Sequence, residues 1–141
     1  MKRFSFRLES VRALREQAEE QAKAELGREL ALEAALRGNV DTALGRLREA
    51  AVHGEGHGAD FVARQAFVER CERELANARH ALSQGQVRVA ERRLQLREAA
   101  RQRETLERLK TRHKLEHDAE GRRAEEAVLS EVGLSMFRSR A

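Results

Sequence analysis

The chain has 141 residues and a formal net charge of +4, with 37% charged residues, 4% aromatic residues and no proline. Its apolar residues are mainly Ala, Leu and Val, which have too little bulk for a wide, rounded core but suffice for a narrow seam between helices. Because proline is absent and good helix formers dominate, the composition excludes an ordinary globule and favours helix almost throughout.

The first predicted helix runs over residues 4–52. Apolar residues recur along it at spacings near three and four, which is the period of one face of a helix. This stripe consists of Phe4, Leu8, Val11, Leu14, Ala18, Ala22, Leu26, Leu30, Leu36, Val40, Leu44, Leu47 and Ala51. We expect that face to pack against a second helix.

A glycine-rich segment follows, and residues 53–60 form the predicted turn. Three glycines fall within five residues there, at Gly54, Gly56 and Gly58, and glycine readily adopts left-handed conformations. Asp60 is the predicted N-cap of the next helix, because its carboxylate can accept a hydrogen bond from a free N–H group of the first turn.

The second predicted helix covers residues 61–132, and residues 133–141 form a C-terminal tail. Apolar residues fall seven apart along it, at Phe61, Val68, Leu75, Leu82, Val89 and Leu96. The partner positions of this heptad are Arg64, Cys71, Ala78, Gly85, Arg92 and Ala99. Several of these are small, so the seam is thin and the facing helix can approach closely. Residues 1–141 therefore read as a single helical hairpin.

Charge favours a folded-back chain over a continuous rod. A turn centred near Gly56 pairs residue i with roughly residue 113 minus i. Residues 16–33 carry six Glu against two basic residues, and the facing residues 79–97 carry five Arg against one Glu. Opposite charges beside a seam set orientation and register. The fold class is thus all-α, a long two-helix antiparallel coiled-coil hairpin whose C-terminal helix overhangs by roughly 30 Å at ~1.5 Å per residue.

At the free end of the hairpin the charge match reverses. Residues 1–15 carry five basic residues against one Glu, and residues 98–112 carry five against three. Two readings stay open: an anionic groove of a partner covers this end, or it is a solvated basic face screened by salt. The candidate partner-binding residues are Arg7, Arg12, Arg103 and Arg108.

The sequence offers no constellation for catalysis, a cofactor or a metal. His113 and His117 lie four apart, a spacing that can chelate a metal, but no third ligand is assured. The histidines beside the turn glycines, His53 and His57, fit a solvated loop. The single cysteine, Cys71, has no placed base and fits a small core residue. We expect neither an enzyme nor a bound cofactor.

Compartment follows from what the chain lacks. One cysteine cannot form an internal disulfide, which suits a reducing compartment. No window of 18 apolar residues and no apolar run near the N-terminus is present, so we expect neither a membrane span nor an export signal. The predicted location is the cytoplasm, with room for a peripheral position at the cytoplasmic face of the inner membrane.

The N-terminal sequence carries a family resemblance. Phe4-Ser5-Phe6-Arg7-Leu8-Glu9-Ser10-Val11-Arg12-Ala13-Leu14-Arg15-Glu16 is followed by Glu20, Ala22-Lys23 and Glu25-Leu26. This opening, the length and the unpaired C-terminal helix resemble the FliJ family of flagellar type III protein export. The resemblance implies a hairpin like the coiled-coil stalk of rotary ATPases. It also implies, as partners, the ring of the export ATPase, the export gate protein FlhA and export chaperones.

The same resemblance implies a gate contact early in the second helix. In the family this contact uses an aromatic residue and an apolar residue four positions later, and Phe67 and Cys71 match that spacing. A packing role in the seam is the alternative for both, because Cys71 belongs to the heptad and Phe67 adjoins Val68.

Two other classes of protein remain alternatives. Residues 79–115 carry eleven Lys or Arg against four Glu, so this helix could lie on nucleic acid or an anionic surface. Interleaved Glu and the absence of aromatic residues between Phe67 and Phe137 argue against it. A generic coiled-coil spacer is the other alternative. We expect a monomer, because each seam has an intramolecular partner at high effective concentration.

Overall fold

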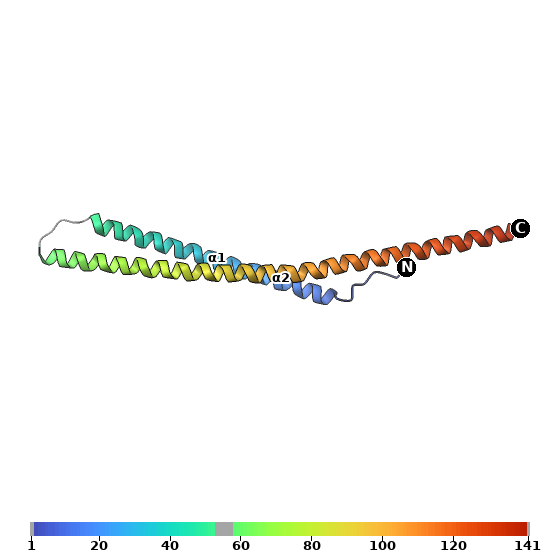
Figure 1. The fold of residues 1–141 in the computed structure, drawn as a ribbon, viewed down its shortest axis with the longest axis horizontal. Coiled ribbons are helices and arrows are strands. Elements are labelled where there is room, and N and C mark those ends of the chain that lie inside the picture. Colours follow the sequence, from blue (N-terminus) through green and yellow to red (C-terminus); the bar gives the residue numbers. More distant parts are fainter. Residues whose placement is uncertain (1, 53–57, 141) are drawn as a thin grey trace. The chain divides into compact units, whose positions relative to one another are not determined.

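The computed structural model describes residues 2–52 and 58–140 and contains two helices (Figure 1). Helix α1 spans Glu9–Val52 and helix α2 spans Ala59–Arg140. The described residues include no β-strand. The two helices pack against each other, which confirms the predicted all-α helical hairpin.

The chain divides into two compact units. The turn-side unit consists of Glu20–Glu98, and the terminal unit consists of Met1–Glu19 with Ala99–Ala141. Each unit combines a stretch of α1 with a stretch of α2. The prediction of one hairpin domain over residues 1–141 stays a prediction.

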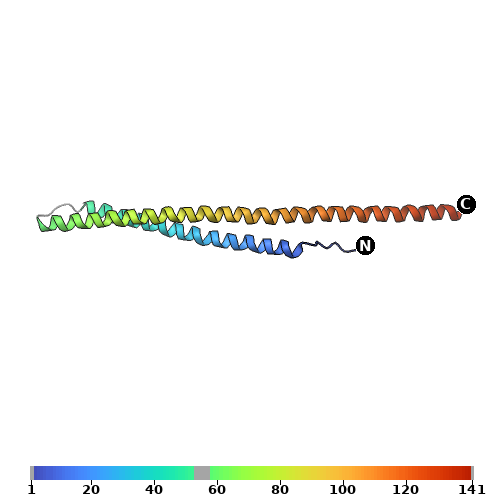
Figure 2. The same ribbon diagram turned by 60° about the horizontal axis from the view of Figure 1, so that its bottom comes forward.

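In the turn-side unit the two helices run antiparallel, side by side (Figure 2). The heptad positions of α2 from Val68 to Leu96 are buried or half-buried, with Leu75 and Val89 at 5% and 3% exposure. Opposite them α1 presents a face that includes Leu26, Leu36, Val40, Ala43 and Leu47. The heptad begins one repeat later than predicted, because Phe61 is exposed.

Small residues do bring the helices close together. Gly85 is buried, and a Cβ atom added to it would lie 2.8 Å from Cδ1 of Leu36. A glycine inside a helix costs stability relative to alanine, so its place here is explained by this close approach. The leucine of α1 fills the space that the missing side chain leaves in α2.

The predicted charge match is confirmed, but the predicted register is wrong. Arg88 Nε lies 3.2 Å from Glu29 Oε2, and Arg92 Nη1 lies 2.6 Å from Glu25 Oε2. With a turn centred near Gly56, Glu25 would have faced residue 88, about one helical turn earlier. The pairing is shifted because the first turns of α2 come before the point where its side chains contact α1. Each residue of α1 therefore faces a residue later in α2 than predicted.

The ends of the predicted turn also need correction. Residues 53–57, including the predicted turn glycines Gly54 and Gly56, lie outside the described residues. Gly58 has a φ of +55°, in the left-handed region that favours glycine, and α2 begins directly after it. The carbonyl of Gly58 accepts the first helical hydrogen bonds, so Asp60 lies inside the first turn rather than at the N-cap. Its negative charge there still suits the helix dipole.

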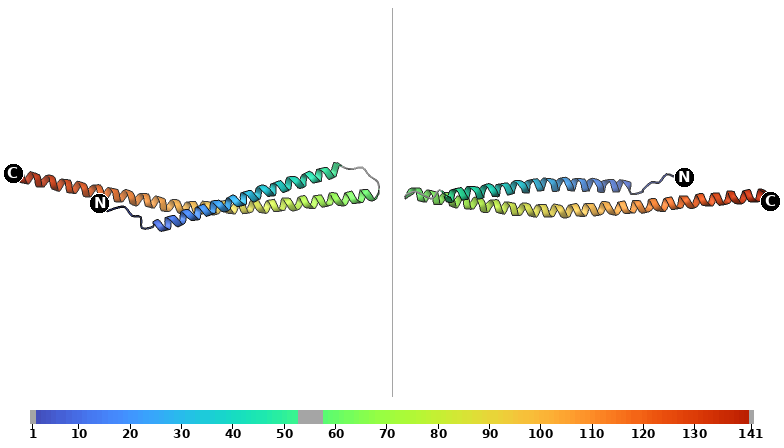
Figure 3. Two further views of the ribbon diagram at one scale, coloured as in Figure 1. Left: turned by 180° about the vertical axis from the view of Figure 1, so that it is seen from behind. Right: turned by 90° about the horizontal axis from the view of Figure 1, so that it is seen from above.

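In the terminal unit, α1 begins at Glu9 and not at Phe4 as predicted. Residues 2–8 are instead a non-helical N-terminal strap that lies along α2 (Figure 3). The Phe6 ring, 6% exposed, meets His113 edge-on at 5.9 Å between ring centroids, and Phe4 meets His117 at 5.5 Å. The two aromatic rings of the strap thus pack on α2 although the strap itself is not helical.

The helix contact of the terminal unit is polar, contrary to the predicted apolar stripe. Leu14 is exposed, whereas Glu19 is 7% exposed and Arg12 is half-buried. Glu19 accepts a hydrogen bond from Nε of Arg103 on α2. The middle of the predicted apolar stripe, Val11, Leu14 and Ala18, is exposed, so these residues do not form the contact with α2.

Helix α2 continues to Arg140, so the predicted tail over residues 133–141 is wrong as far as the structure describes it. Gly133 alone does not end the helix, and the basic residues Arg138 and Arg140 in the last turn suit the negative end of the helix dipole. Past the N-terminal strap, α2 runs on without a facing helix among the described residues (Figure 3). This stretch, residues 121–140, is called the unpaired segment.

Candidate functional site

The structure separates the two residues of the predicted gate contact. Cys71 is 2% exposed and lies in the seam of the turn-side unit. Phe67 is 45% exposed, and the Arg70 guanidinium carbon lies 5.6 Å from its ring centroid. Phe67 is therefore open to a partner, whereas Cys71 has the packing role that its heptad position indicates.

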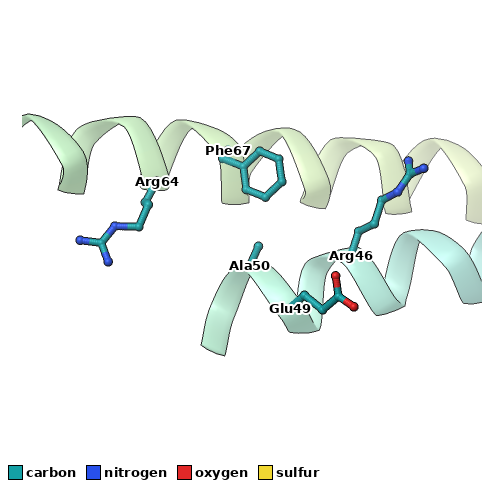
Figure 4. A pocket seen from close by; sticks show the side chains of 5 residues that line it. All are labelled: Arg46, Glu49, Ala50, Arg64 and Phe67. Atoms are coloured by element: carbon teal, nitrogen blue, oxygen red, sulfur yellow. The ribbon is translucent and has the colours of Figure 1, made fainter. Parts of the chain in front are cut away.

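Phe67 forms part of a pocket between α1 and α2 of about 250 Å³. Its lining consists of Arg46, Glu49, Ala50, Arg64 and Phe67. Figure 4 shows the Phe67 ring directed from α2 toward α1, with Arg46 to one side along the helices and Arg64 to the other. The pocket thus combines an aromatic wall with charged side chains at its edge.

The four arginines of the predicted basic end do not share one role. Arg12 forms ion pairs with Glu9 at 2.7 Å, Glu16 at 3.2 Å and Glu107 at 3.3 Å. Arg103 is paired with Glu19 and lies 3.8 Å from Glu107. The two segments with like net charge thus meet through individual pairs of opposite charge, which the net charge of each segment does not reveal.

Glu9 is the most perturbed carboxyl group of this cluster. Hydrogen bonds from Arg12 and then from Lys110, whose Nζ is 2.9 Å away, lower the pKa of Glu9 from 4.5 to about 2. In return, Glu9 raises the pKa of Arg12, and Glu19 raises the pKa of Arg103. Each shift favours the charged form of both partners.

Arg7 and Arg108 differ from the other two. Both side chains are exposed, and neither forms an ion pair within the part of the chain that the structure describes. Only these two members of the predicted set are available as they stand to an acidic partner.

The histidines considered as metal ligands in α2 have other contacts in the structure. His113 and His117 contact the phenylalanines of the strap, and Nε2 of His117 lies 3.1 Å from the carbonyl oxygen of Lys2. No group of three potential metal ligands occurs in residues 2–52 and 58–140. His53 and His57 lie outside the described residues.

Comparison with protein families decides the assignment. The family model described as the flagellar FliJ protein matches residues 4–141. The chain belongs to the FliJ family. Comparisons with curated proteins and with solved structures found no match. FliJ-family membership makes the chain a component of the flagellar export apparatus.

This FliJ-family chain has one surface that sequence reasoning missed. The unpaired segment exposes Val128, Leu129, Val132, Leu134, Met136 and Phe137. A shallow hollow is lined by Gly121, Ala124, Glu125, Val128 and Leu129. The signal was present as apolar residues at spacings of three and four, but the predicted end at residue 132 cut the pattern short. Neither described helix contains a stretch apolar enough to cross a membrane.

Proposed function

We propose that this FliJ-family chain is a non-enzymatic stalk and adaptor of the flagellar type III export apparatus. It works in the cytoplasm, peripherally at the inner membrane, where its terminal unit enters or assembles the export ATPase ring. Its turn-side unit contacts the gate protein FlhA, and export chaperones bind the same adaptor. The family supports a place in the apparatus, and the observations below support these roles.

One relationship on α2 carries the proposal. The residues that face α1 and the strap include Arg103, Lys110, His113 and His117. The same spacing of three and four leads on to Gly121, Ala124, Val128, Val132 and Met136. Residues spaced in this way share one face of a helix. The contact face of α2 therefore continues into the unpaired segment with apolar side chains and no cover among the described residues.

Such a face is expected to bind another protein. Exposed apolar surface of this extent on one helix marks an interaction site. Arg7 and Arg108 belong to the same terminal unit as the unpaired segment, so a ring that receives this unit can also contact them. An acidic lining of the ring would complement them and steer association.

The arrangement weighs against the nucleic-acid alternative. Arg88, Arg92 and Arg103 already pair with glutamates of α1. The basic stretch of α2 thus has less free positive charge than its composition indicates, and phosphate contacts dominate affinity for nucleic acid.

The test measures ATP turnover by the purified export ATPase against the concentration of each variant. Truncation after Glu120 and the double variant Val128→Asp with Val132→Asp should both weaken stimulation. Leu134→Asp is the control, because Leu134, at 61% exposure, is at least as exposed as Val128 and Val132 but lies on another face of the helix. Circular dichroism of the free proteins checks that the hairpin persists. Full stimulation by the truncated protein would refute insertion of this segment into the ring.

A further inference from the structure

The pocket at Phe67 combines an exposed aromatic ring with arginine side chains. Two arginines from different helices flank that ring: Arg46 of α1 lines the pocket, and Arg70 of α2 lies over the ring. Aromatic residues and arginine are the residue types most enriched at the centres of protein interfaces. The combination therefore points to a docking site and to the chemistry of its partner.

Both guanidinium groups can be recruited at little cost. The ion pair of Arg46 with Glu74 is long, at 3.7 Å, and both side chains are substantially exposed, at 63% and 46%. Exposed pairs of this kind contribute little to stability. Arg70 is exposed and forms no ion pair with any residue that the structure describes. A carboxylate that arrives with a partner can thus bind either arginine.

We propose that this pocket binds an acidic segment of a partner protein. An apolar side chain of the segment packs on Phe67, and a neighbouring Asp or Glu pairs with Arg46 and Arg70. The inference rests on the proposed gate contact and specifies its chemistry. Carboxylates bind guanidinium groups with paired N–H···O hydrogen bonds, which adds geometric specificity to charge.

The acids at the same site favour a short acidic segment over a polyanion. Glu49 lines the pocket, and Glu74 lies against Arg46. A single carboxylate can pair with the arginines without contacting Glu49 or Glu74. A phosphate backbone, which carries charge continuously, would be repelled by them. Phe67 also needs an apolar partner, and a phosphate backbone offers none.

The experiment titrates the purified cytoplasmic part of the gate protein with full-length variants at two salt concentrations. Arg46→Glu, Arg70→Glu and Phe67→Ala should each weaken binding about tenfold or more. Arg48→Glu and Arg73→Glu are matched controls, because they make the same charge change nearby on exposed faces away from Phe67, and should stay within about twofold. Added salt should weaken binding of the wild type more than binding of Arg46→Glu or Arg70→Glu, because salt screens the charge pairs that each variant has already lost.

The outcomes separate the two proposals. If the gate protein does not bind the wild type, both the gate contact and its acidic chemistry are refuted. If it binds, and Phe67→Ala weakens it but the charge reversals at Arg46 and Arg70 act like the controls, only the acidic segment is refuted. Equal losses with a short DNA duplex as the titrant would instead assign the pocket to phosphate and overturn the inference.

Discussion

Glu19 of α1 accepts a hydrogen bond from Arg103 of α2 at a position where an apolar side chain would ordinarily fill the seam. Glu19 is among the least exposed of the described residues, and its partner Arg103 is half-buried. A charged pair in this position fixes alignment, because sliding either helix by one turn would leave a shielded charge without its counterpart.

The first prediction tests that pair. Glu19→Leu and Arg103→Leu should each lower the melting temperature, since each removes one partner of this partly buried ion pair. The double variant should recover most of the loss, because two leucines can pack where the charges met. Thermal unfolding followed by circular dichroism measures all three. Additive losses in the double variant would show that the two residues do not act as a pair.

A second prediction concerns the seam of the turn-side unit. Leu75→Ala should reduce the free energy of unfolding by about 2–3 kcal/mol, because it removes buried apolar atoms and leaves a cavity. Leu94→Ala makes the same change at 62% exposure and should cost under about 0.5 kcal/mol. Urea unfolding gives both values. Similar costs at the two positions would contradict the seam as described.

Two helical glycines should respond in opposite directions to a larger side chain. Gly38 has no atom within 4 Å of an added Cβ, so Gly38→Ala should stabilise the hairpin by roughly 0.5–1 kcal/mol through helix propensity. Gly85→Val should destabilise it, because the side chain would collide with Leu36. Chemical unfolding of both variants checks the contrast, and stabilisation by valine at position 85 would be inconsistent with the close approach.

The lowered pKa of Glu9 predicts how stability depends on pH. Because the unfolded chain binds a proton at this carboxyl group near pH 4.5 and the folded chain only near pH 2, acidification between these values favours unfolding. The stabilisation is fully present above pH 4.5. Glu9→Gln should therefore flatten the fall in melting temperature between pH 4.5 and 2. Parallel curves for the two proteins would exclude this contribution.

The N-terminal strap gives a fifth prediction. Phe6→Ala removes the ring that packs on His113, so residues 2–8 should leave α2 more often while α1 and α2 stay helical. Limited trypsin treatment should then cut after Arg3 and Arg7 several-fold faster than in the wild type, with unchanged circular dichroism. Ser5→Ala is the control, because Ser5 is exposed beside the same ring. Equal cleavage rates in Phe6→Ala and wild type would mean that Phe6 does not hold the strap.

Periodicity predicted the helices and most of the α2 seam, because the heptad spacing places Leu75, Leu82 and Val89 on one face of α2. Register was harder to predict. The glycines locate a turn, but they do not say how many residues of α2 precede its first contact with α1. Glu25 therefore lies opposite Arg92, about one helical turn from its predicted position.

The candidate sites were predicted less well, for two physical reasons. The net charge of a segment counts Arg12 as an available positive charge. In the structure Arg12 is paired with three glutamates, and a net charge does not show such pairs. Heptad position explains why Cys71 is buried, but the 45% exposure of Phe67 beside Arg46 and Ala50 of α1 is a tertiary feature that spacing does not give. Spacing between residues identifies helix faces, whereas availability to a partner depends on tertiary contacts.

No large side chain among the described residues is completely removed from solvent. Cooperativity in such a molecule has a short range, because each turn depends on the turns next to it rather than on a shared interior. A pull or a twist applied to one end is then resisted by the hydrogen-bonded helices themselves and absorbed by a few contacts at a time. The hairpin can therefore open locally at one end while the contacts elsewhere along the seam persist.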